Sequence, residues 1–144
     1  MDIIDTLKTY FNTNARAYGI ELAFIYGSYA HQSQSEQSDI DIALVFDDIM
    51  SKDTKKVFEA ITDISAALSK LSSKDVEIIS IDDGFSKPML YYNAIVHGKP
   101  LFISDGNCYI NYFLRAIHEM EDFSTFGMKW QIDLANTLLG KMAS

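Results

Sequence analysis

The sequence predicts an α/β domain, and two observations lead to this prediction. Apolar residues recur at three- and four-residue steps in several segments, as on the buried side of a helix, and short apolar runs of strand length lie between them. Helices and strands that alternate along a chain are typical of α/β folds. Because the 144 residues contain neither an internal repeat nor a linker-like stretch, one domain is expected.

The N-terminal half predicts three strands, each a run of mainly apolar residues bounded by glycine, serine or aspartate. Helices with an apolar stripe precede the first strand and follow the second. In chain order we expect a helix from Ile3 to a break near Gly19, a strand at 21–26, a Gly-Ser turn, a short helix from Tyr29, a polar loop at 32–38, a strand at 39–46, a helix at 52–71 and a strand at 75–80.

The C-terminal half predicts more helix than strand. In chain order we expect a helix at 87–96 that ends at Gly98 as many helices end at glycine, an edge strand at 100–103, and a mostly helical remainder from 109 to 142 with a possible break at Gly127. Residues 1–104 should form the core of the domain. Residues 105–144 should form a helical extension that packs on the same domain.

Composition excludes several classes of function. The formal net charge is −8 and the chain has only two arginines, Arg16 and Arg115, so it lacks the clustered basic surface that direct nucleic-acid binding needs. A basic protein partner suits this charge better. No apolar stretch approaches the roughly 20 residues that cross a bilayer, the N-terminus is unlike a secretory signal, and a lone cysteine, Cys108, excludes an internal disulfide. We therefore expect a cytoplasmic protein that does not bind membranes.

The most informative motif combines a small-residue turn with two alternating carboxylates. Gly27 and Ser28 end one apolar run, and Asp39 and Asp41 open the next, with ten residues between Ser28 and Asp39. Successive side chains on a strand point to opposite faces, so both aspartates should project from one face while Ile40 enters the core. Two adjacent carboxylates repel each other, and a divalent metal is the usual reason to tolerate that repulsion.

This pairing predicts magnesium-dependent chemistry on a nucleoside triphosphate. Magnesium prefers carboxylate and phosphate oxygens, and a Gly-Ser turn at the end of a strand offers N–H groups and a hydroxyl to phosphates. The alternatives are an ordinary turn at Gly27 and Ser28 and a solvated strand edge at Asp39 and Asp41. The spacing between the two halves favours the nucleotide site.

The motif resembles the signature of the nucleotidyltransferase superfamily, a Gly-Ser pair, ten residues and Asp-x-Asp. The resemblance lies in Gly27–Ala30 and Ser38–Val45, and Val96–Phe102 is similar to the closing xxGxPLF segment of that family. The short chain is similar to the minimal nucleotidyltransferases, the MNT antitoxins that are paired with HEPN-domain toxins. This resemblance implies a polymerase-beta-like fold, a small mixed sheet flanked by helices with a C-terminal helical extension.

The resemblance also implies a third acid on the next strand, which acts as a metal ligand or as the base toward the acceptor hydroxyl. Glu77 matches that position, although the usual aspartate is replaced by glutamate, and Asp75 on the same strand face is a competing candidate. His31 stands where many relatives carry an arginine near the triphosphate. The expected catalytic and metal-binding residues are Asp39, Asp41 and Glu77, and the expected nucleotide-binding residues are Gly27, Ser28 and His31.

The function that the resemblance implies is transfer of AMP from ATP, with Mg²⁺, to a tyrosine hydroxyl of a cognate HEPN ribonuclease toxin. Two alternatives remain open. The chain could transfer AMP to a small hydroxylated molecule, or it could be a non-catalytic antitoxin that neutralises its toxin by binding, since Glu77 and His31 depart from the family pattern. The expected partners are the toxin and ATP, and a homo-oligomer is possible.

Overall fold

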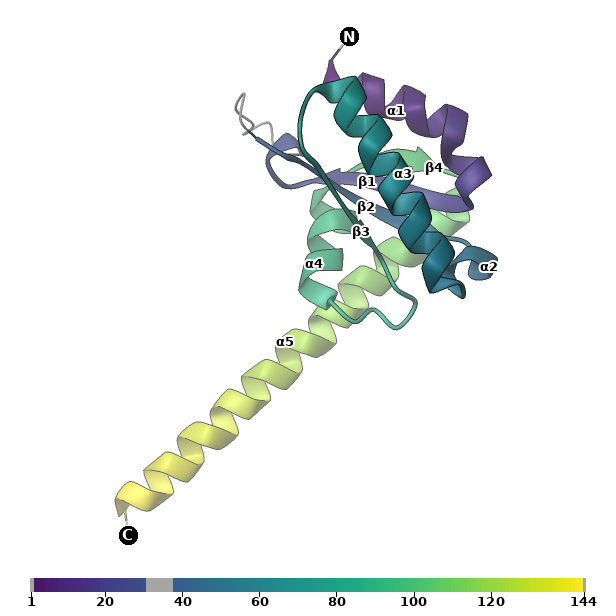
Figure 1. Cartoon of the computed structure of the whole chain (residues 1–144). Helices are drawn as coiled ribbons and strands as arrows, with labels where there is room; N and C mark the ends of the chain where they lie inside the picture. The colour runs from purple at the N-terminus through teal and green to yellow at the C-terminus, as the bar shows by residue number, and fades with distance from the viewer. Residues whose placement is uncertain (1, 31–37, 144) are drawn as a thin grey trace.

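A four-stranded mixed sheet forms the centre of the molecule, in the order β3-β2-β1-β4 (Figure 1). The computed structural model describes residues 2–30 and 38–143, with the side chains of all of these except 123–134 and 141–143. Strand β1 (Ile20–Tyr26) pairs antiparallel with β2 (Ile40–Phe46) and β4 (Lys99–Ile103), and β2 pairs parallel with β3 (Val76–Ser80). The four predicted strands are confirmed to within one residue at each end, and β4 is an edge strand as expected.

Helices α1 (Ile3–Asn14) and α3 (Thr54–Ser72) cover one face of the sheet (Figure 1). The predicted burial of Ile40 is confirmed, because its side chain is 0% exposed. Full burial of one such side chain contributes about 1.5–3 kcal/mol, so this layer is a main source of stability. Its largest fully buried members are Leu7, Phe11, Ile25, Ile40, Ile42, Leu44, Ile64 and Leu68.

The other face is covered by α4 (Pro88–Tyr92), the π-helical turn η3 (Asn93–His97) and the first turns of α5 (Gly106–Ala143). The alternation of strand side chains supplies this second core as well, since every other residue of β1 and β2 points toward it. Its buried members include Leu22, Phe24, Ala43, Val45, Tyr91, Ala94, Ile95 and Ala116.

The helices that follow the first and second strands differ from the prediction. The helix predicted at 52–71 begins at Thr54, because the Asp53 carboxylate caps it by accepting a hydrogen bond from the Lys56 N–H at 3.2 Å. A separate single turn, α2 (Asp48–Ser51), precedes it. The short helix predicted from Tyr29 is instead a 3-10 turn, η2 (Gly27–Tyr29).

Gly98 ends the predicted 87–96 helix, but for a different reason from the one expected. Its φ of −76° is not left-handed, so the usual glycine cap is absent. A Cβ at this position would lie 2.1 Å from the carbonyl oxygen of Ala94 and 2.8 Å from that of Ile25. Glycine is needed here because η3 and β1 approach each other too closely for a side chain.

The C-terminal segment forms one helix, α5, so the break predicted at Gly127 is wrong. A single glycine costs a helix only about 1 kcal/mol, which a helix of 38 residues can absorb. The first turns pack on the sheet, with the Tyr109 ring stacked on Phe24 at 6.0 Å between centroids, and the later turns extend away from it (Figure 1). Among the described residues, no helical stretch combines the length and the apolarity that crossing a membrane requires.

Hydrogen bonds to Asp82 and an ion pair with Arg115 hold the loop between β3 and α4 in place. Asp82 Oδ1 accepts hydrogen bonds from Ser86 Oγ and from the Tyr91 hydroxyl, each at 2.5 Å. Arg115 of α5 pairs with Asp83 at 3.5 Å, and its guanidinium lies 4.8 Å from the Phe85 ring centroid. Although burial acts to raise the pKa of Asp82, the hydrogen bonds from Ser86 and Tyr91 lower it. The loop therefore connects the end of the sheet to both helices of that face.

The Asp82 network predicts a pH-dependent stability. Because the pKa of Asp82 is lowered by folding, its stabilisation is present above the unfolded value near 3.8 and is lost as pH falls through the folded value. We expect Asp82→Asn to melt below the wild type at pH 7, with a gap that closes below about pH 4. Thermal unfolding across pH measures this, with Asp63→Asn on the exposed side of α3 as the control. A gap that does not change with pH would contradict the assignment.

Candidate nucleotide-binding site

Three polar side chains form a row across the sheet. Tyr26 at the end of β1 pairs with Asp41 in the antiparallel register, and Asp41 pairs with Glu77 in the parallel register of β2 and β3. Residues that face each other across paired strands project from the same face. Tyr26 packs against the core under α4 and α5, which places the whole row on that face.

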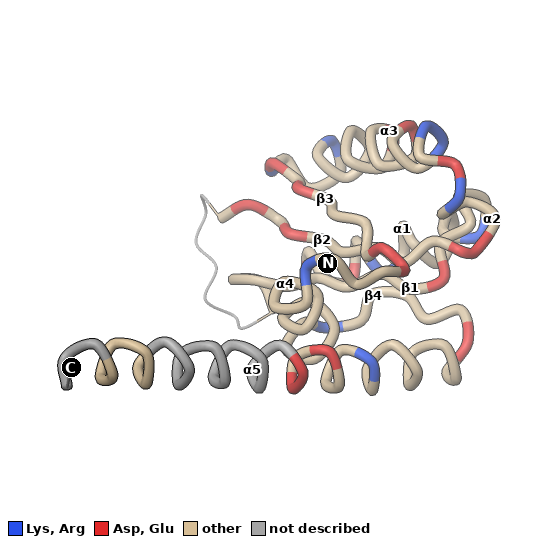
Figure 2. The backbone as a smooth tube through the Cα atoms, turned by 90° about the horizontal axis from the view of Figure 1, so that it is seen from below, with Lys and Arg blue, Asp and Glu red and all other residues tan. Residues whose placement is uncertain are grey.

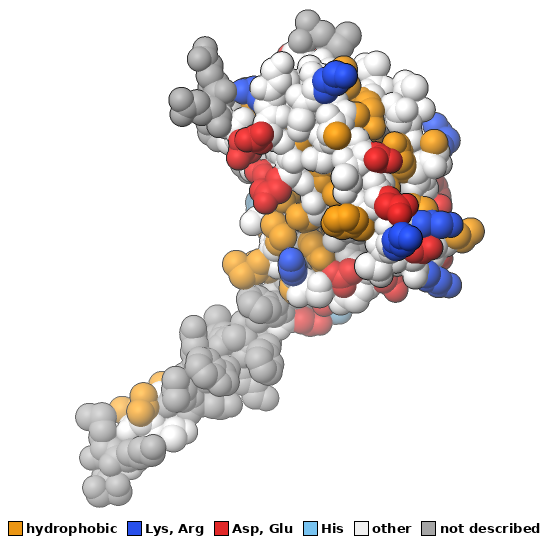
Figure 3. Space-filling model, viewed as in Figure 1, with side chains coloured by type: hydrophobic (Ala, Val, Ile, Leu, Met, Phe, Trp, Pro, Cys, Tyr) orange, Lys and Arg blue, Asp and Glu red, His pale blue; other side chains and the backbone are white. Residues whose placement is uncertain are grey.

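The row lies where the helical cover of this face ends. Glu77 is exposed, and Tyr26 and Asp41 are half-buried. Asp39 and Asp75 stand one residue before β2 and β3 and are exposed, and the Ile40 N–H donates to the Asp75 carbonyl oxygen at 2.9 Å. Acidic residues of the two strand starts lie side by side in the backbone view (Figure 2). Acidic side chains also gather at one edge of the surface in the space-filling view (Figure 3).

Gly27 brings the turn after β1 against the Asp41 carboxylate. Its φ is +72°, in the left-handed region that favours glycine. A Cβ on Gly27 would lie 2.7 Å from Asp41 Oδ2, closer than real contacts allow. The turn continues with the Ala30 N–H donating to the Gly27 carbonyl oxygen at 3.2 Å, and it includes the half-buried Ser28. The two halves of the sequence motif therefore meet in space.

The site concentrates negative charge. Burial raises the pKa of Asp41, and the nearby charges of Glu77 and Asp39 raise it further. Burial, followed by the charges of Asp41 and Glu77, raises the pKa of Tyr26 to about 12, so the phenol is neutral at physiological pH. A bound cation would relieve the repulsion among these carboxylates.

The oxygen donors fit a magnesium ion that shares its coordination with a substrate. Magnesium is usually held by one or two carboxylates together with water and substrate phosphates. Within the described residues, no group of three or more His, Cys, Asp or Glu side chains is arranged to hold a metal by itself.

The structure brings most of the predicted site residues together. Glu77, and not the competing Asp75, is in register with Asp41. His31, predicted to contact the nucleotide, lies outside the described residues. Tyr26 was missed by the sequence reasoning. Its one visible signal is its place directly before Gly27, but its position beside Asp41 depends on an antiparallel register that the sequence does not reveal.

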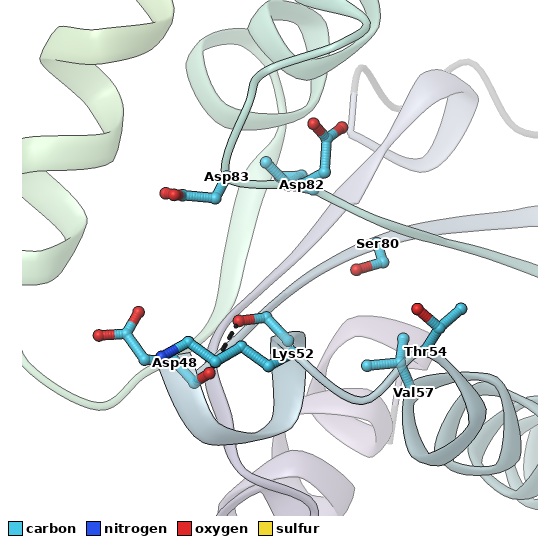
Figure 4. A pocket seen from close by; sticks show the side chains of 9 residues that line it. Asp48, Lys52, Thr54, Val57, Ser80, Asp82 and Asp83 are labelled. Carbon is cyan, nitrogen blue, oxygen red and sulfur yellow. Dashed lines mark hydrogen bonds between the residues drawn. The ribbon is translucent and has the colours of Figure 1, made fainter.

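A pocket of about 410 Å³ lies at the other end of the sheet, away from this row. Ser80 at the end of β3, Lys52 and Thr54 line it together with the loop after β3 (Figure 4). Two of its carboxylates are already engaged, since Asp82 accepts hydrogen bonds within its own loop and Asp83 pairs with an arginine of α5. The row of Tyr26, Asp41 and Glu77 is therefore the better candidate for the functional site.

Comparison with known proteins gives a family match over most of the chain. The sequence profile of the family described as "Polymerase beta, Nucleotidyltransferase" matches residues 5–107. This segment contains the turn and every carboxylate of the row. A comparison with curated proteins gives no match.

Solved structures of toxin–antitoxin complexes have a similar fold. A chain of a toxin-antitoxin structure with AMP-PNP has a TM-score of 0.66 at 18% identity, over 88% of this chain and 97% of that one. A chain from the complex of a tri-AMPylated Shewanella oneidensis HEPN toxin with an MNT antitoxin has a TM-score of 0.61 at 16% identity, over 91% and 98%. A chain of the MntA-HepT toxin-antitoxin has a TM-score of 0.61 at 15% identity, over 90% and 97%.

Proposed function

The chain belongs to the polymerase-beta nucleotidyltransferase family, and on this premise we propose that it is an MNT-type antitoxin that transfers AMP from ATP to a tyrosine hydroxyl of a cognate HEPN toxin. The predicted fold class is confirmed by the family match and the mixed sheet. The observation that carries the proposal is the in-register pair Asp41 and Glu77 beside the Gly27 turn. This arrangement suits the joint binding of a cation and a triphosphate.

The similar solved structures support the choice of substrate and partner. One is described as a toxin-antitoxin with AMP-PNP, and another contains a tri-AMPylated HEPN toxin with an MNT antitoxin. The likeness spans nearly the full length of those chains. The net charge of −8 also suits a partner with a basic surface.

Each part of the site has a distinct role in the proposed reaction. The Gly27–Tyr29 turn offers backbone N–H groups and the Ser28 hydroxyl to the phosphates. Asp39 and Asp41 would hold magnesium together with phosphate oxygens, with Glu77 as the further proposed ligand, and the ion would supply positive charge that offsets the charge of the phosphates. His31 remains a proposed nucleotide contact.

Glu77 is also the best placed carboxylate to accept the proton of the acceptor hydroxyl. It is exposed and lies on the edge strand β3, where a protein acceptor can approach. The acceptor oxygen forms a bond to the α-phosphorus, the bond from that phosphorus to the bridging oxygen breaks, and pyrophosphate leaves with the electron pair. The hydroxyl proton passes to the Glu77 carboxylate.

Labelled ATP tests the proposal directly. The purified protein is incubated with magnesium, the HEPN-type product of the neighbouring reading frame, and ATP labelled at either the α- or the γ-phosphate. We expect the α-label to appear on the partner and the γ-label to be released, because AMP is transferred and pyrophosphate leaves. A stable complex without label would overturn the catalytic proposal and identify a protein that neutralises its toxin by binding. Label on the partner from γ-ATP alone would indicate a kinase.

A further inference from the structure

Tyr26 places a phenol hydroxyl at the end of a row that continues with two carboxylates. Its ring packs against the core under α4 and α5, and its neighbours in register are Asp41 and, beyond it, Glu77. Directly after Tyr26 the chain enters the Gly27 turn, whose carbonyl and N–H groups lie at the end of the same strand. Tyr26 thus stands beside both the turn and the Asp41 carboxylate.

The Tyr26 hydroxyl has no side-chain hydrogen bond to Asp41 or Glu77. Its interaction with Asp41 and Glu77 is Coulombic only. Every fully buried polar side-chain atom of the described residues has a partner, so a Tyr26 hydroxyl without one is not fully buried. A ring held by the core and a free O–H at the surface of the site are the features of a ligand contact, because the packing fixes the donor without using it.

The order of the strands separates two sides of the site. Glu77 lies on β3, an edge strand, whereas Tyr26 lies on β1, an inner strand that leads into the turn. A protein acceptor is bulky and needs the open edge, while a nucleotide that binds the turn must lie over β1. The donor and the proposed base therefore stand on opposite sides of Asp41.

We propose that Tyr26 is a nucleotide-binding residue whose phenol O–H donates a hydrogen bond to an oxygen of the ATP phosphates or ribose, on the β1 side of Asp41. This inference rests on the proposed function. The phenol can fill this role among carboxylates because an uncharged O–H donates a hydrogen bond without forming an ion pair. A charged donor would pair with the carboxylates instead.

Tyr26→Phe tests the inference, because it removes the hydroxyl and leaves the packed ring. We expect the Kd for AMP-PNP, measured by calorimetry with magnesium and without the toxin, to rise about five- to tenfold, as expected for one lost hydrogen bond. The KM for ATP should rise by a similar factor with kcat within twofold. Tyr10→Phe is the matched control, since Tyr10 is also half-buried but packs on the α1 face. It should leave both quantities unchanged.

Glu77→Gln should act mainly on kcat, in contrast to Tyr26→Phe. It should lower kcat by a larger factor than it raises the Kd for AMP-PNP, because the base acts on the acceptor while Asp39 and Asp41 still hold magnesium. If Tyr26→Phe lowers kcat at constant Kd, or lowers the melting temperature of the free protein, Tyr26 serves the acceptor or the fold and the inference is wrong. Unchanged Kd in Tyr26→Phe also overturns it. If the wild type itself does not bind AMP-PNP, the proposed function fails rather than the role of Tyr26.

Discussion

Replacing Asp41 with asparagine is expected to lower nucleotide transfer by about a thousandfold, because a proposed magnesium ligand at the centre of the row is lost. The asparagine side chain has the same shape, so the strand pairing with Tyr26 and Glu77 should be kept. The labelling assay measures the loss, and Asp63→Asn on the far face should transfer AMP at the wild-type rate. Activity within tenfold of the wild type in Asp41→Asn would remove the carboxylate row from the mechanism.

The same substitution should stabilise the protein when magnesium is absent. The pKa of Asp41 is raised above 3.8 in the folded state, so its ionisation works against folding. The protonated Asp41 side chain favours the folded state. This stabilisation is complete below the unfolded pKa and is lost as pH rises through the folded pKa. At pH 7 without magnesium, Asp41→Asn should therefore melt above the wild type, and this difference should vanish below about pH 4. Addition of magnesium and AMP-PNP should stabilise the wild type alone.

Gly27→Ala is expected to damage both stability and activity. The left-handed φ of +72° costs a residue with a Cβ about 1–2 kcal/mol. The new methyl group would also lie 2.7 Å from Asp41 Oδ2 and push the carboxylate out of place. A displacement of this kind costs catalysis about a hundredfold.

Denaturant unfolding and the labelling assay together measure the two effects of Gly27→Ala. Gly106→Ala is the matched control, because a Cβ at Gly106 meets no atom within 4 Å. The control should be as stable and as active as the wild type. If Gly27→Ala loses stability but keeps its activity, the turn is a structural element and does not position the site.

The sequence reveals the strands and the faces of the site because both follow from the alternation of side chains. Asp39 and Asp41 are two residues apart at the start of a strand whose later residues are apolar. This spacing alone predicts that they lie on the same face. The partners of Asp41 depend on register. No local sequence pattern shows that β2 pairs antiparallel with β1 and parallel with β3, and these pairings place Tyr26 and Glu77 beside Asp41.

The errors in the helices have local physical causes. Position 98 requires glycine because the backbone packs closely against Ile25. A glycine that caps a helix would look the same in the sequence. Gly127 was predicted to break a helix because glycine weakens helices, yet neighbouring residues with good helix propensity outweigh one weak position. Asp53 begins a new helix because its carboxylate caps it, which divides the predicted 52–71 segment from α2.

The parallel pairing of β2 with β3 makes the site sensitive to the length of the connection that precedes β3. That connection leaves α3 through Ser73, which has a φ of 58°, and enters β3 at Val76. Inserting or deleting one residue there would turn Glu77 to the α1 face and set an apolar neighbour beside Asp41. Substitutions in this segment can be absorbed, but a change in its length would exchange the carboxylate for a hydrocarbon.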